Sequence, residues 1–275
     1  MSRRHGDYPD GVEIIDLSED EIEYSGQRRQ RLPRAPAYLQ TGGQVRQIAA
    51  PAPFHIRPAG EVRPAHALCI ARRPDSLAAQ QYRLLKYKLK EGVDPRVIGI
   101  SSPLEREGKT TATANLGLAL AEGRRVQIML LDLNLRRPAL IEMFGIEGGG
   151  GVGEQLRRKR RDPDAYWDVL ELGSRLHLMA GGGPTDNPAP LLNSEELPRL
   201  IYDLAEHYDY VVVDLPAVSS AADVKIVQEQ LDAMVMVCRA GATTKSSLTA
   251  AMKQLGTTKV QGALMLDVRP RYMPK

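Results

Sequence analysis

Residues 96–123 read RVIGISSPLEREGKTTATANLGLALAEG, and this stretch decides the fold. Its opening apolar run, RVIGI, predicts a buried strand, and KTTATANLGLALAEG predicts a helix that ends at a glycine. Gly108, Lys109 and Thr110 lie between these elements and match the last three positions of the phosphate-loop pattern G-x-x-x-x-G-K-[ST]. The front of the loop lacks the glycines that such loops normally carry. We therefore expect a strand, a phosphate-binding loop with an altered front, and a helix.

Short apolar runs alternate with helical segments along the rest of the chain. The further strands are predicted at residues 125–133, 175–181, 208–216, 231–241 and 260–268. The helices are predicted around 194–207, 221–230 and 244–255, and over 76–92 with Leu77, Leu84, Leu85 and Leu89 near one face. This alternation predicts an open α/β fold, a mostly parallel sheet with helices on both faces. The Gly108-Lys109-Thr110 motif between the first strand and its helix makes the P-loop NTPase type the expected one. Ligands of such folds bind at the carboxyl ends of the strands.

Three strand ends carry side chains that suit phosphate and metal. Lys109 is expected to reach the β- and γ-phosphates of a nucleotide, and the Thr110 hydroxyl to hold Mg²⁺. Asp132, with Asn134 just beyond it, ends one predicted strand, and Asp214 ends a very apolar one. Mg²⁺ prefers one or two carboxylates together with hydroxyl and phosphate oxygens. We therefore assign catalysis to Lys109, Asp132 and Asp214, and the metal to Thr110, Asp132 and Asp214.

Backbone N–H groups at the start of the helix are expected to cradle the phosphates. The residues concerned are Glu107, Gly108, Lys109, Thr110 and Thr111. Each motif alone has a simpler explanation, because GKT can open an ordinary helix and an aspartate at a strand end is often only a helix cap. Together, in the right order on the right elements, the motifs favour a nucleotide site.

The composition limits the classes of function. The chain has 275 residues and a formal net charge of +3, which is too mild to indicate a nucleic-acid partner. Cys69 and Cys238 lack metal-ligand spacing, so neither a zinc site nor a disulfide framework is expected. The apolar runs fall short of the roughly 18 residues that span a bilayer, and the N-terminus lacks the apolar core of a signal peptide. We expect a cytoplasmic protein.

Two regions of different composition are expected. Residues 1–66 mix charge, Pro, Gly and Gln without a sustained period, which predicts a disordered arm or linker. Within it, VEIIDL at 12–17 has the character of a short docking peptide, and Tyr24 follows an acidic run as a phosphoacceptor would. The alternative is a solvated tail with incidental apolar residues. Residues 67–275 are expected to form the nucleotide-binding domain.

The longer motifs resemble those of the bacterial tyrosine kinases of capsule and exopolysaccharide synthesis, which are relatives of the MinD and ParA ATPases. The resemblance covers about residues 74–268 and rests on SLAAQQYRLLKYKLK, EGKTTATANL, LLDLNLRRPALIEMFGI, YDYVVVDLPAVSSAADV and LMAGGGPTDNPAPLLNSEELPRLI. The last string is the most telling, because most P-loop proteins do not share its Gly-Pro, Asn-Pro and Leu-Leu-x-Ser elements.

This resemblance implies a protein-tyrosine kinase that binds ATP and Mg²⁺ and regulates exopolysaccharide or capsule synthesis or export. It also implies homo-oligomeric rings, a membrane-embedded chain-length regulator as a separate chain that recruits the protein to the inner face of the cell membrane, and an opposing phosphotyrosine phosphatase. Carried over, Lys109 and Thr110 bind phosphate and metal, Asp132 takes the metal-linked or base role, and Asp214 is the Walker B carboxylate. The acceptor tyrosine would be Tyr272 or Tyr24.

Several positions depart from the family pattern. Arg106 stands where a glycine is usual, and a Cβ at that position opposes a positive φ by about 1–2 kcal/mol. Asn134 replaces an aspartate, Ala217 replaces the second proline of a Pro-Pro pair, and the C-terminal tail offers Tyr272 alone. The positions of the family's ring contacts hold Gln80, Arg83 and Lys86 instead of Glu, Arg and Arg.

Other functions stay open on these residues. The departures favour a degenerate member, a nucleotide-sensing or scaffolding partner of the membrane regulator with little kinase activity. A positioning ATPase like MinD or ParA is disfavoured because Leu104 sits near the place of their extra lysine. The basic run RRKRR at 157–161 fits a polyanion contact or, more simply, a solvated helix end. No chemistry is assigned to His177 and His207, and packing is expected for Tyr82, Tyr87, Tyr208 and Tyr210.

Overall fold

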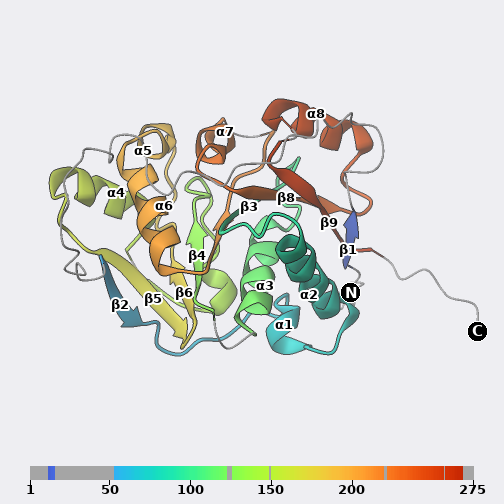
Figure 1. The fold of residues 1–275 in the computed structure, drawn as a ribbon, viewed down its shortest axis with the longest axis horizontal. Helices are drawn as coiled ribbons and strands as arrows, with labels where there is room; N and C mark the ends of the chain where they lie inside the picture. The colour runs from blue at the N-terminus through green and yellow to red at the C-terminus, as the bar shows by residue number, and fades with distance from the viewer. Residues whose placement is uncertain are drawn as a thin grey trace, which may run out of the picture.

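Among the residues that the structure describes, nine strands form one sheet (Figure 1). The computed structural model describes residues 12–15, 53–122, 126–148, 150–219, 222–256 and 258–268. The strand order is β1-β9-β8-β3-β7-β4-β6-β5-β2. The strands are β1 Val12–Ile15, β2 Phe54–Pro58, β3 Val97–Ser101, β4 Ile128–Asp132, β5 Trp167–Gly173, β6 Leu176–Met179, β7 Tyr210–Asp214, β8 Ala233–Arg239 and β9 Val260–Leu266.

The six strands from β9 to β6 in this order run parallel. The innermost of them are apolar and buried on both faces, as parallel strands between two layers of helices must be. At the edges, β5 runs antiparallel to β6, β2 runs parallel to β5, and β1 runs antiparallel to β9. The predicted α/β fold with a mostly parallel sheet is confirmed.

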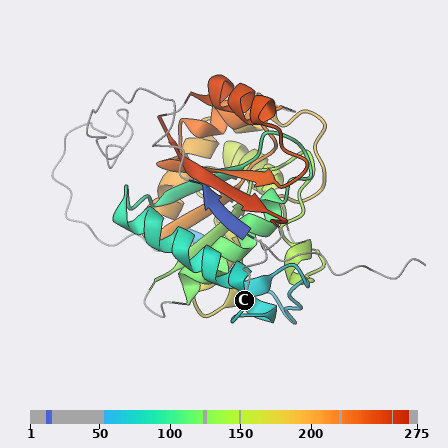
Figure 2. The ribbon, with the colours of Figure 1, turned by 90° about the vertical axis from the view of Figure 1, so that its right-hand side faces the viewer.

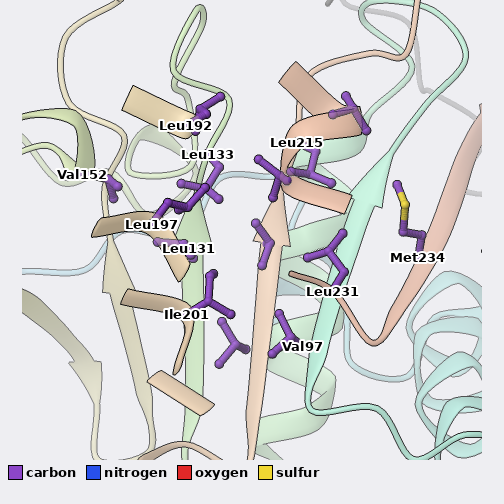
Figure 3. Close-up of a cluster of buried hydrophobic side chains, with 14 of the residues drawn as sticks. Val97, Leu131, Leu133, Val152, Leu192, Leu197, Ile201, Leu215, Leu231 and Met234 are labelled. Atoms are coloured by element: carbon purple, nitrogen blue, oxygen red, sulfur yellow. The ribbon is translucent and has the colours of Figure 1, made fainter. Parts of the chain in front are cut away.

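Helices cover both faces of the sheet. They are α1 Cys69–Arg72, α2 Leu77–Glu91, α3 Lys109–Ala121, α4 Val152–Arg161, α5 Ala189–Leu192, α6 Glu196–His207, α7 Asp223–Gln228 and α8 Lys245–Leu255, with a 3-10 turn η2 at Glu142–Phe144. Successive strand residues point to opposite faces, so Ile98 packs with α1, α2 and α3, whereas Val97 packs on the side of α4 to α8. Figure 3 shows the hydrophobic cluster on the side of α4 to α8, in which Leu197 of α6 lies near Leu131 of β4.

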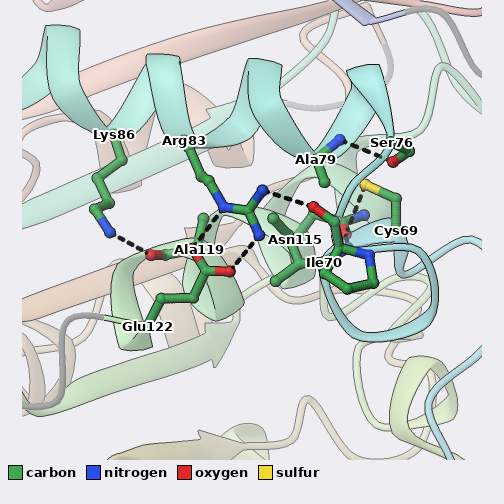
Figure 4. Close-up of polar contacts among 10 residues, drawn as sticks. Cys69, Ile70, Ser76, Ala79, Arg83, Lys86, Asn115, Ala119 and Glu122 are labelled. Atoms are coloured by element: carbon green, nitrogen blue, oxygen red, sulfur yellow. Dashed lines mark hydrogen bonds and ion pairs between the residues drawn. The ribbon is translucent and has the colours of Figure 1, made fainter.

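Polar contacts join α2 to α3 at the surface (Figure 4). Arg83 donates two hydrogen bonds to the Glu122 carboxylate, at 2.9 and 2.7 Å. Lys86 Nζ donates to the Ala119 carbonyl at 2.7 Å. Arg83 and Lys86, two of the three positions where the resemblance led us to expect contacts between subunits, therefore bond within the chain and join α2 to α3.

The buried face of α2 differs from the predicted one. Ser76 caps the helix by accepting a hydrogen bond from the Ala79 N–H, and Gly92 follows its end, as predicted. Its buried side chains are Ala78, Ala79, Tyr82, Leu85 and Leu89. Leu77 and Leu84 are 66% and 42% exposed, so their assignment to the buried face was wrong. The buried face of the helix therefore combines two leucines with two alanines and one tyrosine.

Two strands come from the region expected to be a disordered arm. Within the predicted docking peptide, β1 lies beside β9 (Figure 2), where Val12 pairs with Leu266. At the other end of the sheet, β2 pairs with β5 along its length, and the Arg63 N–H then donates to the Phe144 carbonyl at 2.7 Å. Two short segments of the expected arm therefore lie in the sheet, where backbone hydrogen bonds to neighbouring strands order them.

Candidate nucleotide-binding site

Three predicted motifs meet at the carboxyl end of the sheet, where β3, β7 and β4 are neighbours. β3 leads into residues 102–108, here called the phosphate loop, and then into α3. Asp214, the last residue of β7, is in register with Ile100 of β3 and with Asp132 of β4. Because these strands are parallel, the loops that follow them all leave the sheet at the edge formed by the carboxyl ends of the strands.

The back of the phosphate loop has a shape that suits an anion. Gly108 has a φ of 94° and precedes α3, whose first turn has no side-chain cap. The positive φ favours glycine at this position. A Cβ on Gly108 would also lie 2.5 Å from Leu266 Cδ1, so the leucine side chain would have to move. A helix start without a capping side chain leaves N–H groups for another acceptor, and a phosphate is a natural one.

Lys109 is the first residue of α3 and is only 5% exposed. Its Nζ lies 3.7 Å from Glu105 Oε2. A buried ammonium is costly without an anionic partner, and the Glu105 carboxylate supplies one from the front of the loop. Lys109 therefore presents its charge where an anion is held, as the lysine of a phosphate loop must.

Two threonines of α3 face Asp214. Thr110 Oγ1 donates to Asp214 Oδ2 at 2.6 Å, and Thr113 Oγ1 lies 3.5 Å from Asp214 Oδ1 and 3.1 Å from the Lys109 carbonyl oxygen. Thr113 was not predicted, although its position one helical turn beyond Lys109 and Thr110 indicated the same helix face. A hydroxyl beside a carboxylate is the oxygen pair that Mg²⁺ prefers.

Asp214 and Asp132 are two buried carboxyl groups on neighbouring strands. Burial raises the pKa of Asp214 to about 6, although the Thr110 hydrogen bond and the Lys109 charge act in the opposite direction. Burial, and then the nearby Asp214 charge, raise the pKa of Asp132 well above its usual range. A cation beside these groups would relieve both effects.

The donor set fits a metal only together with other oxygens. Among the described residues, no group of three or more His, Cys, Asp and Glu side chains could hold a metal ion. Thr110, Asp132 and Asp214 bring one hydroxyl and two carboxyl groups to this end of the sheet. Mg²⁺ usually keeps several waters and takes one or two carboxylates plus substrate phosphates, so these residues fit Mg²⁺ carried by a nucleotide.

Asp132 is bonded to its own loop rather than to α3. Its Oδ1 accepts from the Asn134 N–H at 3.1 Å, and its Oδ2 accepts from the Ala139 and Leu140 N–H groups at 3.1 and 3.0 Å. Three backbone donors thus fold the loop after β4 around one carboxylate. The side chain of Asn134 is buried beside it, at 7% exposed.

Arg136 ties the loop after β4 to other parts of the same end of the sheet. Its Nε donates to Asp223 Oδ2, at the start of α7, at 2.8 Å, and its Nη1 donates to the Asp186 carbonyl at 2.7 Å. Asp223 is 2% exposed, so this ion pair satisfies a buried carboxylate. Arg137, the next residue, is exposed.

The front of the phosphate loop adopts a positive φ at Arg106, the conformation that a residue with a Cβ makes costly. Arg106 has a φ of 61°, in the left-handed region, where a Cβ costs about 1–2 kcal/mol. Glu107 is buried, and its Oε2 accepts from the Leu104 N–H at 2.8 Å, while its Oε1 accepts from the Thr243 hydroxyl. Its side chain supports the loop from behind. Thr111 lies in the first turn of α3.

Three of the four tyrosines for which packing was expected are buried, and one is exposed. Packing is confirmed for the buried Tyr82, Tyr208 and Tyr210. Tyr87 is 56% exposed on α2 and donates to Glu91 at 2.5 Å, so its assignment to packing was wrong. His177 Nδ1 lies 2.7 Å from the Tyr208 hydroxyl. The two candidate acceptors, Tyr24 and Tyr272, lie outside the described residues.

The basic run at 157–161 forms the end of α4. Arg158 pairs with Asp168 at 2.7 Å, and Lys159 is buried with its Nζ 4.8 Å from the centroid of the Trp167 ring. Arg157, Arg160 and Arg161 are exposed. This arrangement agrees with the simpler interpretation, a helix end that is solvated and faces acidic residues.

The fold and the arrangement at the carboxyl end of the sheet are those of the P-loop class. No protein-family model matches the chain. Its sequence is 31% identical over 197 residues to the tyrosine-protein kinase YwqD of Bacillus subtilis. The matched region covers 70% of this chain and 82% of YwqD. A match of this extent shows common descent, and the chain belongs to the family of bacterial tyrosine kinases.

Two further relatives frame this result. The chain is 30% identical over 180 residues to the succinoglycan biosynthesis transport protein ExoP of Rhizobium meliloti. The matched region covers 62% of this chain but 22% of ExoP. The structure resembles the solved BceF tyrosine kinase domain with a TM-score of 0.62 and 28% identity, over 75% of this chain and 83% of that one. Of the helices described for this chain, none is long and apolar enough to cross a membrane.

Proposed function

We propose that this protein binds Mg·ATP at the carboxyl end of β3, β7 and β4 and transfers a phosphoryl group to tyrosine. The observation that carries the proposal is the 2.6 Å hydrogen bond between Thr110 and Asp214 beside the buried Lys109. A hydroxyl and a carboxylate held together next to a lysine are the parts that a P-loop site uses for metal and phosphate. Membership in the tyrosine-kinase family supports the same reaction.

Each side chain has a distinct role in this proposal. Bound Mg·ATP supplies the phosphoryl group. Thr110 and Asp214 would hold the metal, and the N–H groups of Gly108 to Thr111 would hold phosphate oxygens. Lys109 would exchange its contact with Glu105 for one with phosphate and stabilise the charge of the transferred group. Asp132, buried beside Asp214, is proposed for the metal-linked or base role.

The setting of the reaction is proposed from the relatives. The name of ExoP places that protein in succinoglycan biosynthesis and transport, which supports a role for this chain in exopolysaccharide or capsule synthesis or export. A membrane-embedded chain-length regulator, other copies of this chain and a phosphotyrosine phosphatase are the proposed partners, with recruitment to the inner face of the membrane. Because Arg83 and Lys86 bond within the chain, ring contacts through them would compete with α3.

A second candidate function is a nucleotide-sensing scaffold with little phosphotransfer. Two observations favour it. Arg106 occupies a left-handed conformation in the phosphate loop, and Asn134 leaves one negative charge fewer beside Asp132 than the family pattern provides. Either change could lower turnover while nucleotide binding persists, since both leave Lys109, Thr110 and Asp214 in place.

Titration calorimetry with Mg·ATP tests the nucleotide site. The parent protein should bind, and Lys109→Met should weaken binding at least about tenfold, because a buried charge that faces phosphate is lost. Lys253→Met, which changes an exposed lysine in the last turn of α8, is the matched control and should bind like the parent. Absence of heat with the parent protein would contradict both the kinase and the sensing function.

Tyrosine phosphorylation separates the kinase from the scaffold. The protein is incubated with Mg·ATP and its membrane regulator and then probed with an anti-phosphotyrosine antibody, alongside Lys109→Met. The kinase function predicts a signal that Lys109→Met abolishes. No signal from either protein, with ATP binding intact in the parent, would favour the scaffold.

A further inference from the structure

The turn after β8, residues 239–243, holds the phosphate loop through a relay of hydrogen bonds. The Thr243 hydroxyl donates to Glu107 Oε1 and accepts from the Arg239 N–H at 2.7 Å. The other Glu107 oxygen accepts from the Leu104 N–H at 2.8 Å, inside the loop. Glu107 is 2% exposed. A buried carboxylate therefore connects Thr243 to the backbone at the front of the loop.

Further contacts reach the same loop from the ends of β8 and β9. Arg239 Nη1 donates to the Arg106 carbonyl at 3.2 Å, and its Nε donates to Asp267. Leu266, the last residue of β9, occupies the space that a Cβ on Gly108 would need. Residues 104, 106 and 107 are thus each connected, directly or through Glu107, to the end of β8 and the turn that follows it.

These contacts fall where the loop sequence is least suited to its shape. A glycine adopts a positive φ at no steric cost, whereas Arg106 holds a φ of 61° with a Cβ present. A strained backbone persists only where the surroundings over-determine it. Because a hydrogen bond to a charged group is stronger than a neutral one, the Thr243–Glu107 contact is well suited to impose the loop shape.

We propose that Thr243 is a positioning residue for nucleotide phosphate. Through Glu107 it holds the phosphate loop in the shape that directs Lys109 and the first N–H groups of α3 to the ligand, and so substitutes for the glycine that the loop lacks. The role in binding rests on the proposed nucleotide function. The effect on loop shape does not, because every contact above exists within the chain alone.

Hydrogen–deuterium exchange on the nucleotide-free protein tests the effect on loop shape. Thr243→Val removes the hydroxyl at nearly constant volume, whereas Thr243→Ser keeps it. Amides of residues 102–108 should exchange at least several-fold faster in Thr243→Val than in the parent and in Thr243→Ser, with β7 amides unchanged. Thr249→Val, the same change at an exposed position on α8, is the matched control. Equal exchange in all four proteins would overturn the proposal.

Calorimetry with Mg·ATP then tests the effect on binding. Thr243→Val should bind about tenfold more weakly and Thr243→Ser within about twofold of the parent, because serine keeps the hydroxyl through which residue 243 bonds the Glu107 carboxylate. In a Glu107→Gln background, Thr243→Val should cause little further loss, since both changes interrupt one relay. Parent-like binding by Thr243→Val, or equal losses in Thr243→Val and Thr243→Ser, would overturn the positioning role. A parent protein that binds no nucleotide would contradict the proposed function, and exchange would then decide the loop support alone.

Discussion

Asp214 and Asp132 end neighbouring strands, and both are fully buried, yet their surroundings differ. Asp214 contacts two hydroxyls, Thr110 and Thr113, which can rotate toward other partners. Asp132 accepts three backbone N–H groups that cannot turn away. The difference teaches that two similar motif positions are held differently: the partners of Asp214 can turn toward a ligand, whereas Asp132 also fixes the shape of its own loop, in addition to the role proposed for it beside the metal.

Alanine substitution of each carboxylate should give the largest difference in the free energy of unfolding between the two positions. Asp132→Ala leaves three backbone N–H groups without their acceptor, at about 1–3 kcal/mol for each buried group, so the free energy of unfolding should fall by about 3 kcal/mol or more. Asp214→Ala removes a carboxylate whose burial is itself costly and leaves hydroxyls that can rotate, so the free energy of unfolding at neutral pH should not fall. Urea unfolding of both variants measures the difference. Equal losses would show that the two carboxylates do the same structural work.

The pH dependence of stability should sharpen the comparison. The folded-state pKa of Asp214, about 6, lies above its ordinary value of 3.8, so the native state binds this proton more tightly than the unfolded state. The free energy of unfolding should therefore fall as the pH rises from about 4 to about 6, by up to about 3 kcal/mol at about 1.4 kcal/mol per pH unit.

The control for this pH dependence is Asp214→Ala, which lacks the titrating group. Urea unfolding at a series of pH values should give a larger fall for the parent than for the variant over this interval. Carboxylates distant from Asp214 contribute equally to both curves. The loss of the Asp214 charge also lowers the pKa of Asp132, so the difference between the curves reports the titration of this pair. Curves that stay parallel would contradict a raised pKa at Asp214.

Arg106 offers a smaller test at the front of the phosphate loop. Arg106→Gly should relieve the left-handed strain and raise the free energy of unfolding by about 1 kcal/mol, after part of the gain is offset by the greater freedom of glycine in the unfolded chain. Arg106→Ala keeps a Cβ and is the matched control, which should show no such gain. Thermal unfolding of the two variants against the parent measures this effect, and a loss of stability in Arg106→Gly would contradict the strain.

Local pattern was sufficient to predict the centre of the molecule. The strand, loop and helix around Lys109 were predicted because apolar runs, helical spacing and the GKT string all lie within one short stretch. Asp214 was placed correctly at the end of its strand because VVVD is apolar up to its last residue. The edges were harder to predict. β5 carries Asp168 and Glu171 among its apolar residues, so its pattern is mixed, and β1 and β2 are ordered by pairing with distant strands.

Long-range side-chain contacts were not predictable from the sequence. The Thr243–Glu107 hydrogen bond joins residues 136 positions apart, and no motif links them. The inward turn of Arg83 depends on Glu122 at the end of α3, which helical periodicity in α2 does not reveal. The sequence could indicate that the loop front was unusual, whereas only the fold shows which residues hold it.

The Mg²⁺ dependence of ATP binding tests the proposed metal role of Asp214 most directly. Titration calorimetry is run on the parent protein and on Asp214→Ala, each with Mg²⁺ and with a chelator. If Thr110 and Asp214 hold the metal, the parent should bind ATP at least about tenfold more tightly with Mg²⁺, and Asp214→Ala should lose this enhancement. A folded Asp214→Ala protein that keeps the full Mg²⁺ enhancement would contradict the account.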